Sequence, residues 1–203
     1  MSADPVFKSI FGADWDRLPP VMRKHYANRS FSHDRVTVAG TLTIRLSWLY
    51  KILSPLLKLT RTLVPVDGND VPTIVNFLSD PDSSAFCFDR HVSLPGAPLR
   101  FFSRMVPAGG NEMVEHTGSG IAWHCRFRYD GKRVWLEHIA YVTQLFGRRV
   151  RLPLEFLIGR GGAWEEAVDE DTFSMFVEIR HALFGQLYSY SGAFTVTEMA
   201  LDG

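Results

Sequence analysis

The sequence predicts a mainly β fold of the α+β kind: a curved antiparallel meander or partly closed barrel with N-terminal helices packed against it. After residue 65, short runs rich in β-branched and aromatic residues follow one another. Turn signals separate these runs, among them AGGN at 108, TGSG at 117 and DG at 130. Because no helical pattern intervenes between most of the runs, consecutive strands are expected to pair antiparallel.

Composition indicates one domain, 1–203. The chain has 203 residues, 46% of them hydrophobic and 22% charged, which is enough to bury one sizeable core. Within the domain we expect a helical N-terminal segment over 1–30, a kinked amphipathic helical cover over 46–64 and an antiparallel sheet over 72–200. The 22 basic and 22 acidic residues cancel, so no global positive field would hold a polyanion, and nucleic acid is not an expected partner.

Targeting signals and thiol chemistry are not evident. The opening residues, MSADPVFKSIFGADW, lack both a basic leader and an apolar stretch of signal-peptide length. No other segment has the roughly 18 charge-free apolar residues of a membrane span, so we expect a cytoplasmic protein. The only cysteines, Cys87 and Cys125, are too few for a disulfide framework or a thiolate metal site, and we interpret them as buried free thiols.

Two short helices are expected before the first strand. Asp4 can cap a helix that has Pro5 at its first position and ends before Gly12. A second helix is expected after Pro19 and Pro20. Residues 35–45, RVTVAGTLTIR, are rich in β-branched residues and alternate around Gly40, which predicts a strand with a possible bulge at the glycine.

Residues 47–65, SWLYKILSPLLKLTRTLVP, carry three basic residues, no acidic residue and a large excess of leucine. Lys51, Lys58 and Arg61 fall on a narrow stripe beside a broad apolar face. Pro55 cannot sit in an unbroken helix, so we expect a helix, a bend and a second helix that begins after Ser54. The leucine face would cover the sheet, and the basic stripe would meet either water or an anionic membrane.

The remaining strands are predicted over 72–78, 85–92, 98–106, 112–117, 121–129, 133–142, 173–181 and 186–197. Residues 150–160, VRLPLEFLIGR, are expected to form a turn or a short helix that closes one end of the sheet. A run of arginines between 147 and 160 precedes a run of acidic residues between 165 and 171. These charges suit solvated loops that attract each other across a turn, or else the arginines join Lys51, Lys58 and Arg61 to face an anionic head group.

The segment RFRYDGKRVWLEH predicts a hairpin, since Asp130 and Gly131 suit a two-residue turn that needs positive φ. This turn would pair Tyr129 with Lys132. One face of the hairpin is then apolar, with the pairs Phe127 and Val134, Cys125 and Leu136, and Trp123 and His138. The other face mixes polar and aromatic residues, with the pairs Arg128 and Arg133, Arg126 and Trp135, His124 and Glu137, and Ala122 and Ile139.

Two interpretations of this second face are open. It could meet solvent, with Arg126 over the Trp135 ring and His124 beside Glu137 as a surface ion pair. Alternatively, a strongly curved sheet would turn it inward, which gives a candidate ligand-binding set that Trp48 and Lys51 of the cover complete. That set is His124, Arg126, Trp135, Glu137, Tyr141, Trp48 and Lys51. The pair of His124 and Glu137 could also serve as a general base.

Other chemistry is not supported by the residues. His138, on the apolar face, is interpreted as a hydrogen-bonded core histidine. The histidines lack the spacing of a zinc protease, so no metal is expected. TGSG at 117 and GRGG at 159 do not continue into a phosphate loop or a dinucleotide fingerprint, and no cofactor is expected. No serine lies in a nucleophile-elbow pattern.

Two long segments resemble a bacterial family, domain of unknown function 4166. They are FKSIFGADWDRLPPVMRKHY near the N-terminus and LPLEFLIGRGGAWEEAVDEDTFSMFVEIRHALFGQLYSYSGAF near the C-terminus. His181 and Ala182 stand where a proline near LFG is expected. The resemblance implies no established activity and no catalytic residue, and it implies proteins that occur alone or attached to dehydrogenase-like domains.

The leading hypothesis is non-enzymatic binding of a hydrophobic or amphipathic, lipid-like molecule in the curved sheet, with residues 47–65 as a lid and as a contact to anionic membrane. One alternative is an accessory module for a partner oxidoreductase. Another is a small hydrolase or isomerase that uses His124 and Glu137. The sequence leaves the oligomeric state open.

Overall fold

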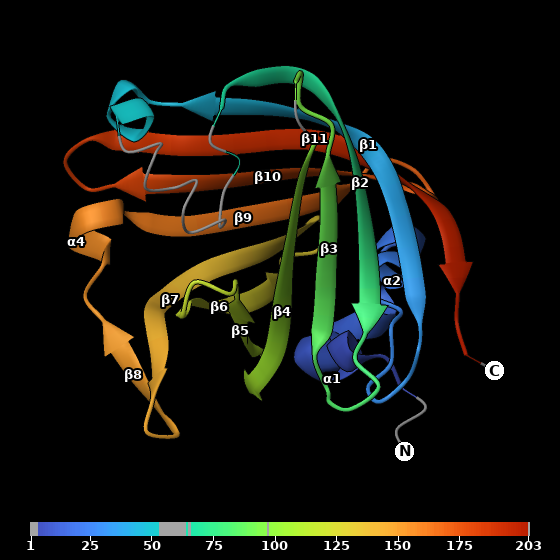
Figure 1. Ribbon diagram of the computed structural model, residues 1–203. Coiled ribbons are helices and arrows are strands. Elements are labelled where there is room, and N and C mark those ends of the chain that lie inside the picture. Colours follow the sequence, from blue (N-terminus) through green and yellow to red (C-terminus); the bar gives the residue numbers. More distant parts are fainter. Residues whose placement is uncertain (1–3, 53–63, 65, 97, 203) are drawn as a thin grey trace.

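The computed structural model describes residues 4–52, 64, 66–96 and 98–202 (Figure 1). Three short N-terminal helices, α1 (Val6–Phe11), η1 (Gly12–Arg17) and α2 (Pro20–His25), precede the sheet. The strands are β1 (Arg35–Leu46), β2 (Gly68–Ser79), β3 (Phe86–Val92), β4 (Leu99–Gly109), β5 (Glu112–His116), β6 (Ile121–Tyr129), β7 (Arg133–Leu145), β8 (Arg148–Leu152), β9 (Arg160–Ala167), β10 (Thr172–His181) and β11 (Gly185–Ala200). One further helix, α4 (Glu155–Ile158), lies between β8 and β9.

The sheet closes on itself. The strands follow the order β6-β5-β4-β3-β2-β1-β11-β10-β9-β7-β8, and an additional pairing joins β6 to β7. All strands of this ring pair antiparallel, and β8 adds to the edge of β7 outside the ring. The protein is therefore a closed ten-stranded antiparallel barrel. The mainly β prediction is confirmed, and closure is complete rather than partial.

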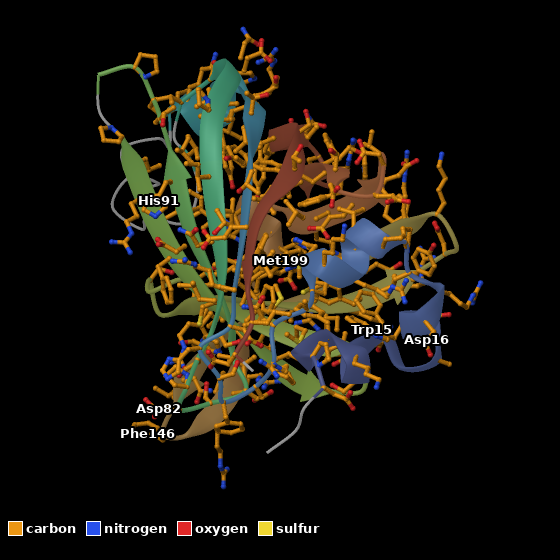
Figure 2. All side chains as sticks on the ribbon, turned by 90° about the vertical axis from the view of Figure 1, so that its right-hand side faces the viewer. Trp15, Asp16, Asp82, His91, Phe146 and Met199 are labelled. Atoms are coloured by element: carbon orange, nitrogen blue, oxygen red, sulfur yellow. The ribbon has the colours of Figure 1, made fainter. Side chains whose placement is uncertain are left out.

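The N-terminal helices seal one end of the barrel, which we call the plugged end. Phe7 is fully buried, and its ring centroid lies 4.4 Å from that of Tyr26, 4.9 Å from Phe86 and 5.1 Å from Phe127. Such aromatic contacts add to the area that the rings remove from water. The two predicted helices are thus confirmed, and Figure 2, which labels Trp15 and Asp16 of η1, shows the three helices together on one side of the molecule.

The plugged end is tied to the C-terminus by Asp34, whose side chain is fully buried. The Asp34 carboxylate accepts hydrogen bonds from the guanidinium and the backbone N–H of Arg29 and from the backbone N–H of Asp202. Burial raises the pKa of Asp34, but these hydrogen bonds outweigh it and lower the pKa from 3.8 to about 2. A charged carboxylate therefore fixes the loop between α2 and β1.

We call the opposite end the rim end. It is formed where β1 ends, where α4 leads into β9 and where β10 turns into β11. Residues 48–52 are helical, and the backbone N–H of Ser47 donates to the carbonyl of Leu187 at 2.8 Å. Figure 1 shows this helix, the β10–β11 turn and α4 along one margin of the barrel. The predicted bend at Pro55, with Lys58 and Arg61, lies outside the described residues, and among those described no helix could span a membrane.

Residues 160–167 correct a prediction. The charged segment after Gly159 was expected to be a solvated loop, but it forms β9, a central strand between β7 and β10. Gly161, Gly162 and the two glutamates weaken the usual β signal, and barrel closure overrides it. The expected turn or short helix near 150–160 is partly confirmed by α4, although Arg148–Leu152 forms strand β8.

The glycine of β1 has a different role from the expected one. The register of β1 shifts against β11 between Thr37 and Val38, and against β2 between Leu42 and Ile44, so the bulge predicted at Gly40 is wrong. A Cβ at Gly40 would lie 2.0 Å from the carbonyl oxygen of Ala193. Glycine is needed because two strands approach closely as the sheet bends into a barrel.

The predicted register of the hairpin is also wrong, by two residues from the turn to Cys125 and by three beyond it. Tyr129 pairs with Val134, because the Asp130 carboxylate accepts the backbone N–H groups of Lys132 and Arg133 and extends the turn. Between the turn and Cys125 this shift keeps the side chains on their predicted faces. A bulge between His124 and Cys125 then adds one more residue and turns Tyr141 to the inner face, against the prediction. The observed partners are Leu136 for Phe127, His138 for Cys125, Tyr141 for Trp123, Trp135 for Arg128, Glu137 for Arg126, Ala140 for His124 and Val142 for Ala122.

Candidate functional site

Side chains that point into the barrel differ in exposure along its axis. Near the plugged end they are fully buried, and Phe77, Phe86, Met113 and Phe127 each keep 3% or less of their surface exposed. Halfway along the axis, inward-facing side chains of β3 to β7 and β9 to β11 are only partly buried. This inner ring comprises Phe88, Arg90, Phe101, Glu115, Trp123, Leu136, Glu165, Met175, Val177 and Tyr190.

A charged cluster forms one side of the inner ring. Arg90 on β3 donates to the Ser103 hydroxyl on β4 at 2.7 Å and to the Glu115 carboxylate on β5 at 3.2 Å. The Ser103 hydroxyl also donates to Glu115 at 2.6 Å. The Arg90 guanidinium lies 4.4 Å from the ring centroid of Phe88 and 5.3 Å from that of Phe101. Ion pairing and aromatic faces together keep this charge stable inside an apolar wall.

A second polar group links the inner ring to the plug. Glu165 on β9 accepts a hydrogen bond from the Tyr26 hydroxyl, and His25 Nε2 lies 3.4 Å from the same carboxylate oxygen. Burial raises the pKa of Glu165, but His25 and the Tyr26 hydroxyl outweigh it, so the pKa is lowered. Glu165 is therefore a carboxylate at neutral pH, held 12% exposed inside the barrel.

Tyr190 and Trp123 complete the polar part of the inner ring. Burial raises the pKa of Tyr190 to about 12, so its hydroxyl stays neutral. The Trp123 indole N–H donates to His138 Nδ1 at 3.0 Å, which leaves the His138 proton on Nε2, 3.4 Å from Glu155. Burial lowers the pKa of His138, and the prediction of a hydrogen-bonded core histidine is confirmed.

The predicted ligand-binding residues do not gather in one place. Arg126 and Glu137 lie on the outer face of the barrel, where Glu137 pairs with Arg128. His124 lies on the same outer face, and its Nε2 is 2.9 Å from Glu112 rather than beside Glu137, so the predicted acid–base pair is not formed. Tyr141 is buried and pairs with Trp123 on the inner face.

The two predicted residues of the cover lie at the rim end. Trp48 is 70% exposed, and the Lys51 ammonium forms an ion pair of 2.5 Å with Asp67. Within the described part of the chain, neither residue forms a hydrogen bond or an ion pair with the outer face of the hairpin. The proposed contact of this predicted set with a ligand stays a prediction.

Trp135 and Glu137 share a shallow outer groove of about 280 Å³. Gly162 leaves the floor open between Glu137 on β7 and Glu178 on β10, its two cross-strand neighbours. The Trp164 ring lies 4.2 Å below the Arg133 guanidinium. Because Arg128 and Arg180 already pair with the two glutamates, this groove offers few free polar groups.

Sequence reasoning missed the polar residues of the inner ring. The signal was present in the alternation of the strands: Arg90 follows Phe86 and Phe88 at every second position, and Glu115 follows Met113 in the same way. A charged residue in a core-facing position of a strand is uncommon and indicates a functional or closely paired group. Glu165 could not be identified from strand alternation, because strand β9 was not predicted.

The fold and the polar inner ring define a closed antiparallel β-barrel with a helical plug. The family model of the Domain of unknown function (DUF4166) matches residues 18–194, and the chain belongs to this family. A comparison with curated proteins gives no match. Among solved structures, Rv2717c from M. tuberculosis is similar with a TM-score of 0.40 and 13% sequence identity, over 93% of this chain and 99% of that one.

Proposed function

We propose that the barrel binds a hydrophobic or amphipathic small molecule at the inner ring. The observation that carries this proposal is the partial exposure of inward-facing side chains on most strands of a barrel whose plugged end is sealed. Tyr190 is one of these partly buried residues, and burial raises the pKa of its hydroxyl to about 12, so this polar group stays neutral.

The chemistry of the inner ring supports an amphipathic occupant. Phe88, Phe101, Leu136, Met175 and Val177 supply apolar walls. The Arg90 cluster and the Tyr190 hydroxyl supply a few polar groups on one side. Small-molecule sites are usually built this way, with apolar walls that give affinity and a few polar groups that fix orientation.

A filling experiment tests the proposal. Val177→Phe adds a ring to the inner ring, and Ile74→Phe adds the same ring on the outer face of β2, where Ile74 is 47% exposed. The probe is 1-aminoanthracene, which joins apolar rings to one amine and fluoresces more strongly in apolar surroundings. Wild type and Ile74→Phe are expected to bind it with equal affinity, and Val177→Phe to bind it at least about ten-fold more weakly, because one large contact is lost.

The fold of each variant is checked by its unfolding midpoint in urea. If Val177→Phe does not fold, Leu136→Phe places a ring at the same level from β7 and serves the same purpose. Equal binding of the probe by both filled variants and the wild type would contradict an internal site. Absence of binding by the wild type would contradict it as well.

A further inference from the structure

The rim end carries large apolar side chains that nothing in the described chain covers. Six of them project from three separate segments and are each between 60% and 86% exposed. We call them the apolar rim: Trp48 and Ile52 of the helix after β1, Phe156 and Leu157 of α4, and Leu183 and Phe184 of the β10–β11 turn. A contiguous apolar surface on a folded domain usually marks a contact with a membrane or a partner.

Hydrogen bonds and a ring contact hold these segments side by side. His181 binds the carbonyl oxygen of Phe156 through Nε2 at 3.0 Å, and its ring centroid lies 4.9 Å from that of Phe184. The helix after β1 is fixed to β11 by the hydrogen bond from Ser47 to Leu187. In Figure 1 the three segments occupy one margin of the barrel. The exposed side chains of the apolar rim therefore lie on segments that are fixed at one margin of the barrel.

Four cations lie on or beside the segments that carry the apolar rim. Arg160 begins β9 next to α4, is exposed, and forms no ion pair within the described residues. Lys51, Arg151 and Arg180 keep 56%, 64% and 60% of their side chains exposed although they pair with Asp67, Glu155 and Glu178. Exposed apolar and tryptophan side chains beside arginine and lysine form the pattern of an interfacial membrane contact, in which the cations reach lipid phosphates.

We propose that the apolar rim docks the protein onto the surface of a phospholipid bilayer that contains anionic lipid. The six side chains enter the interface between head groups and acyl chains, and Arg160, with Lys51, Arg151 and Arg180, lies at the level of the phosphates. This docking is independent of an internal ligand, and it adds a location to the binding function proposed above. It places the rim end, rather than the plugged end, against the lipid.

The test is co-flotation of the full chain with vesicles of phosphatidylcholine alone and of phosphatidylcholine with phosphatidylserine. The wild type is expected to float with the mixed vesicles and more weakly with phosphatidylcholine. Two double variants, Phe156→Ser/Leu157→Ser and Leu183→Ser/Phe184→Ser, are each expected to lower the partition coefficient about ten-fold or more. Arg160→Glu is expected to reduce the preference for the mixed vesicles.

Phe146→Ser is the matched control. Phe146 is 96% exposed in the turn between β7 and β8, and Figure 1 shows this hairpin at the lower left, away from the helix after β1, the β10–β11 turn and α4. Figure 2 labels Phe146 near the lower edge of the molecule. The control is expected to float like the wild type. The proposal is overturned if the wild type floats with neither vesicle, or if it shows no preference for phosphatidylserine.

Two further results would also overturn it. Flotation that survives both double variants, or that Phe146→Ser weakens as strongly, would place the contact elsewhere. A concentration-dependent dimer in light scattering that the double variants abolish would assign the apolar rim to a second copy of the chain.

Discussion

The two ends of the barrel differ in whether their large apolar side chains are buried or exposed. At the plugged end, α1, η1 and α2 bring Phe7, Trp15 and Tyr26 against the barrel and leave each 9% exposed or less. At the rim end, Phe156 and Leu183 remain more than 80% exposed. Since apolar area removed from water stabilises a fold, the plugged end is expected to supply stability, and the rim end is free for contacts with other molecules.

The largest expected change in the free energy of unfolding comes from replacing a phenylalanine by alanine at the plugged end, and the same replacement at the rim end is its control. Phe7→Ala removes a fully buried ring that packs on Tyr26, Phe86 and Phe127, and should lower the free energy of unfolding by about 4 kcal/mol. Phe184→Ala at the rim end should change it by less than about 0.5 kcal/mol. Urea unfolding followed by tryptophan fluorescence measures both. Equal losses would show that the two ends do not differ in their contribution.

A second effect concerns the charge that ties the plugged end. Asp34→Asn leaves Arg29 without its buried partner and should cost about 3 kcal/mol at pH 7. The folded pKa of Asp34 is about 2, below its usual 3.8, so this stabilisation is present above pH 3.8 and is lost as the pH falls toward 2. Unfolding measured from pH 6 to pH 2.5 should therefore show the variant and wild type converging in acid. A gap that does not narrow would contradict the assignment.

Arg90 and Glu115 lie between the two ends, and a double-mutant cycle can measure the interaction energy of this pair. Arg90→Met removes the cation and leaves Glu115 inside the barrel, which should cost about 2 kcal/mol. Adding Glu115→Gln should restore part of this loss, because no uncompensated charge then remains. Urea unfolding of the wild type, the two single variants and the double variant gives the interaction free energy between Arg90 and Glu115. If the losses simply add, the two groups do not interact in the folded protein.

The smallest effect belongs to the rim end and depends on pH. Burial lowers the pKa of His138 below its usual 6.5, so the folded protein holds it neutral where the unfolded chain would protonate it. The free energy of unfolding should therefore fall slightly as the pH drops below about 6.5, by about 1 kcal/mol at most for a single proton. His138→Gln should remove the part of this decrease in the free energy of unfolding that comes from His138. An unchanged pH dependence in the variant would contradict the neutral, Trp123-bonded histidine.

The sequence predicts the plugged end better than the rest of the molecule. Helix signals around Pro5, Pro19 and Pro20 and the strand alternation after residue 65 depend on local chemistry, and these elements form as expected. Closure of the barrel and strand β9 depend on pairings between distant segments, which local patterns do not encode. The hairpin shows the limit most clearly, because the Asp130 carboxylate moves the register by two residues and a bulge farther along turns Tyr141 to the opposite face.

The candidate site lies elsewhere than predicted for the same reason, because it depends on pairings between distant segments. His124, Arg126 and Trp135 were placed together by the predicted register, and the same alternation put them on a face whose direction only the closed barrel decides. The inner ring instead collects Arg90, Glu115 and Glu165 from β3, β5 and β9. No spacing along the chain connects these residues.

Native mass spectrometry of the intact protein, purified without detergent, tests the internal site most directly. We expect the wild type to carry the additional mass of a small apolar or amphipathic molecule, which is released on denaturation and is absent from Val177→Phe. A bare mass for the wild type, together with no binding of 1-aminoanthracene, would contradict an internal ligand site.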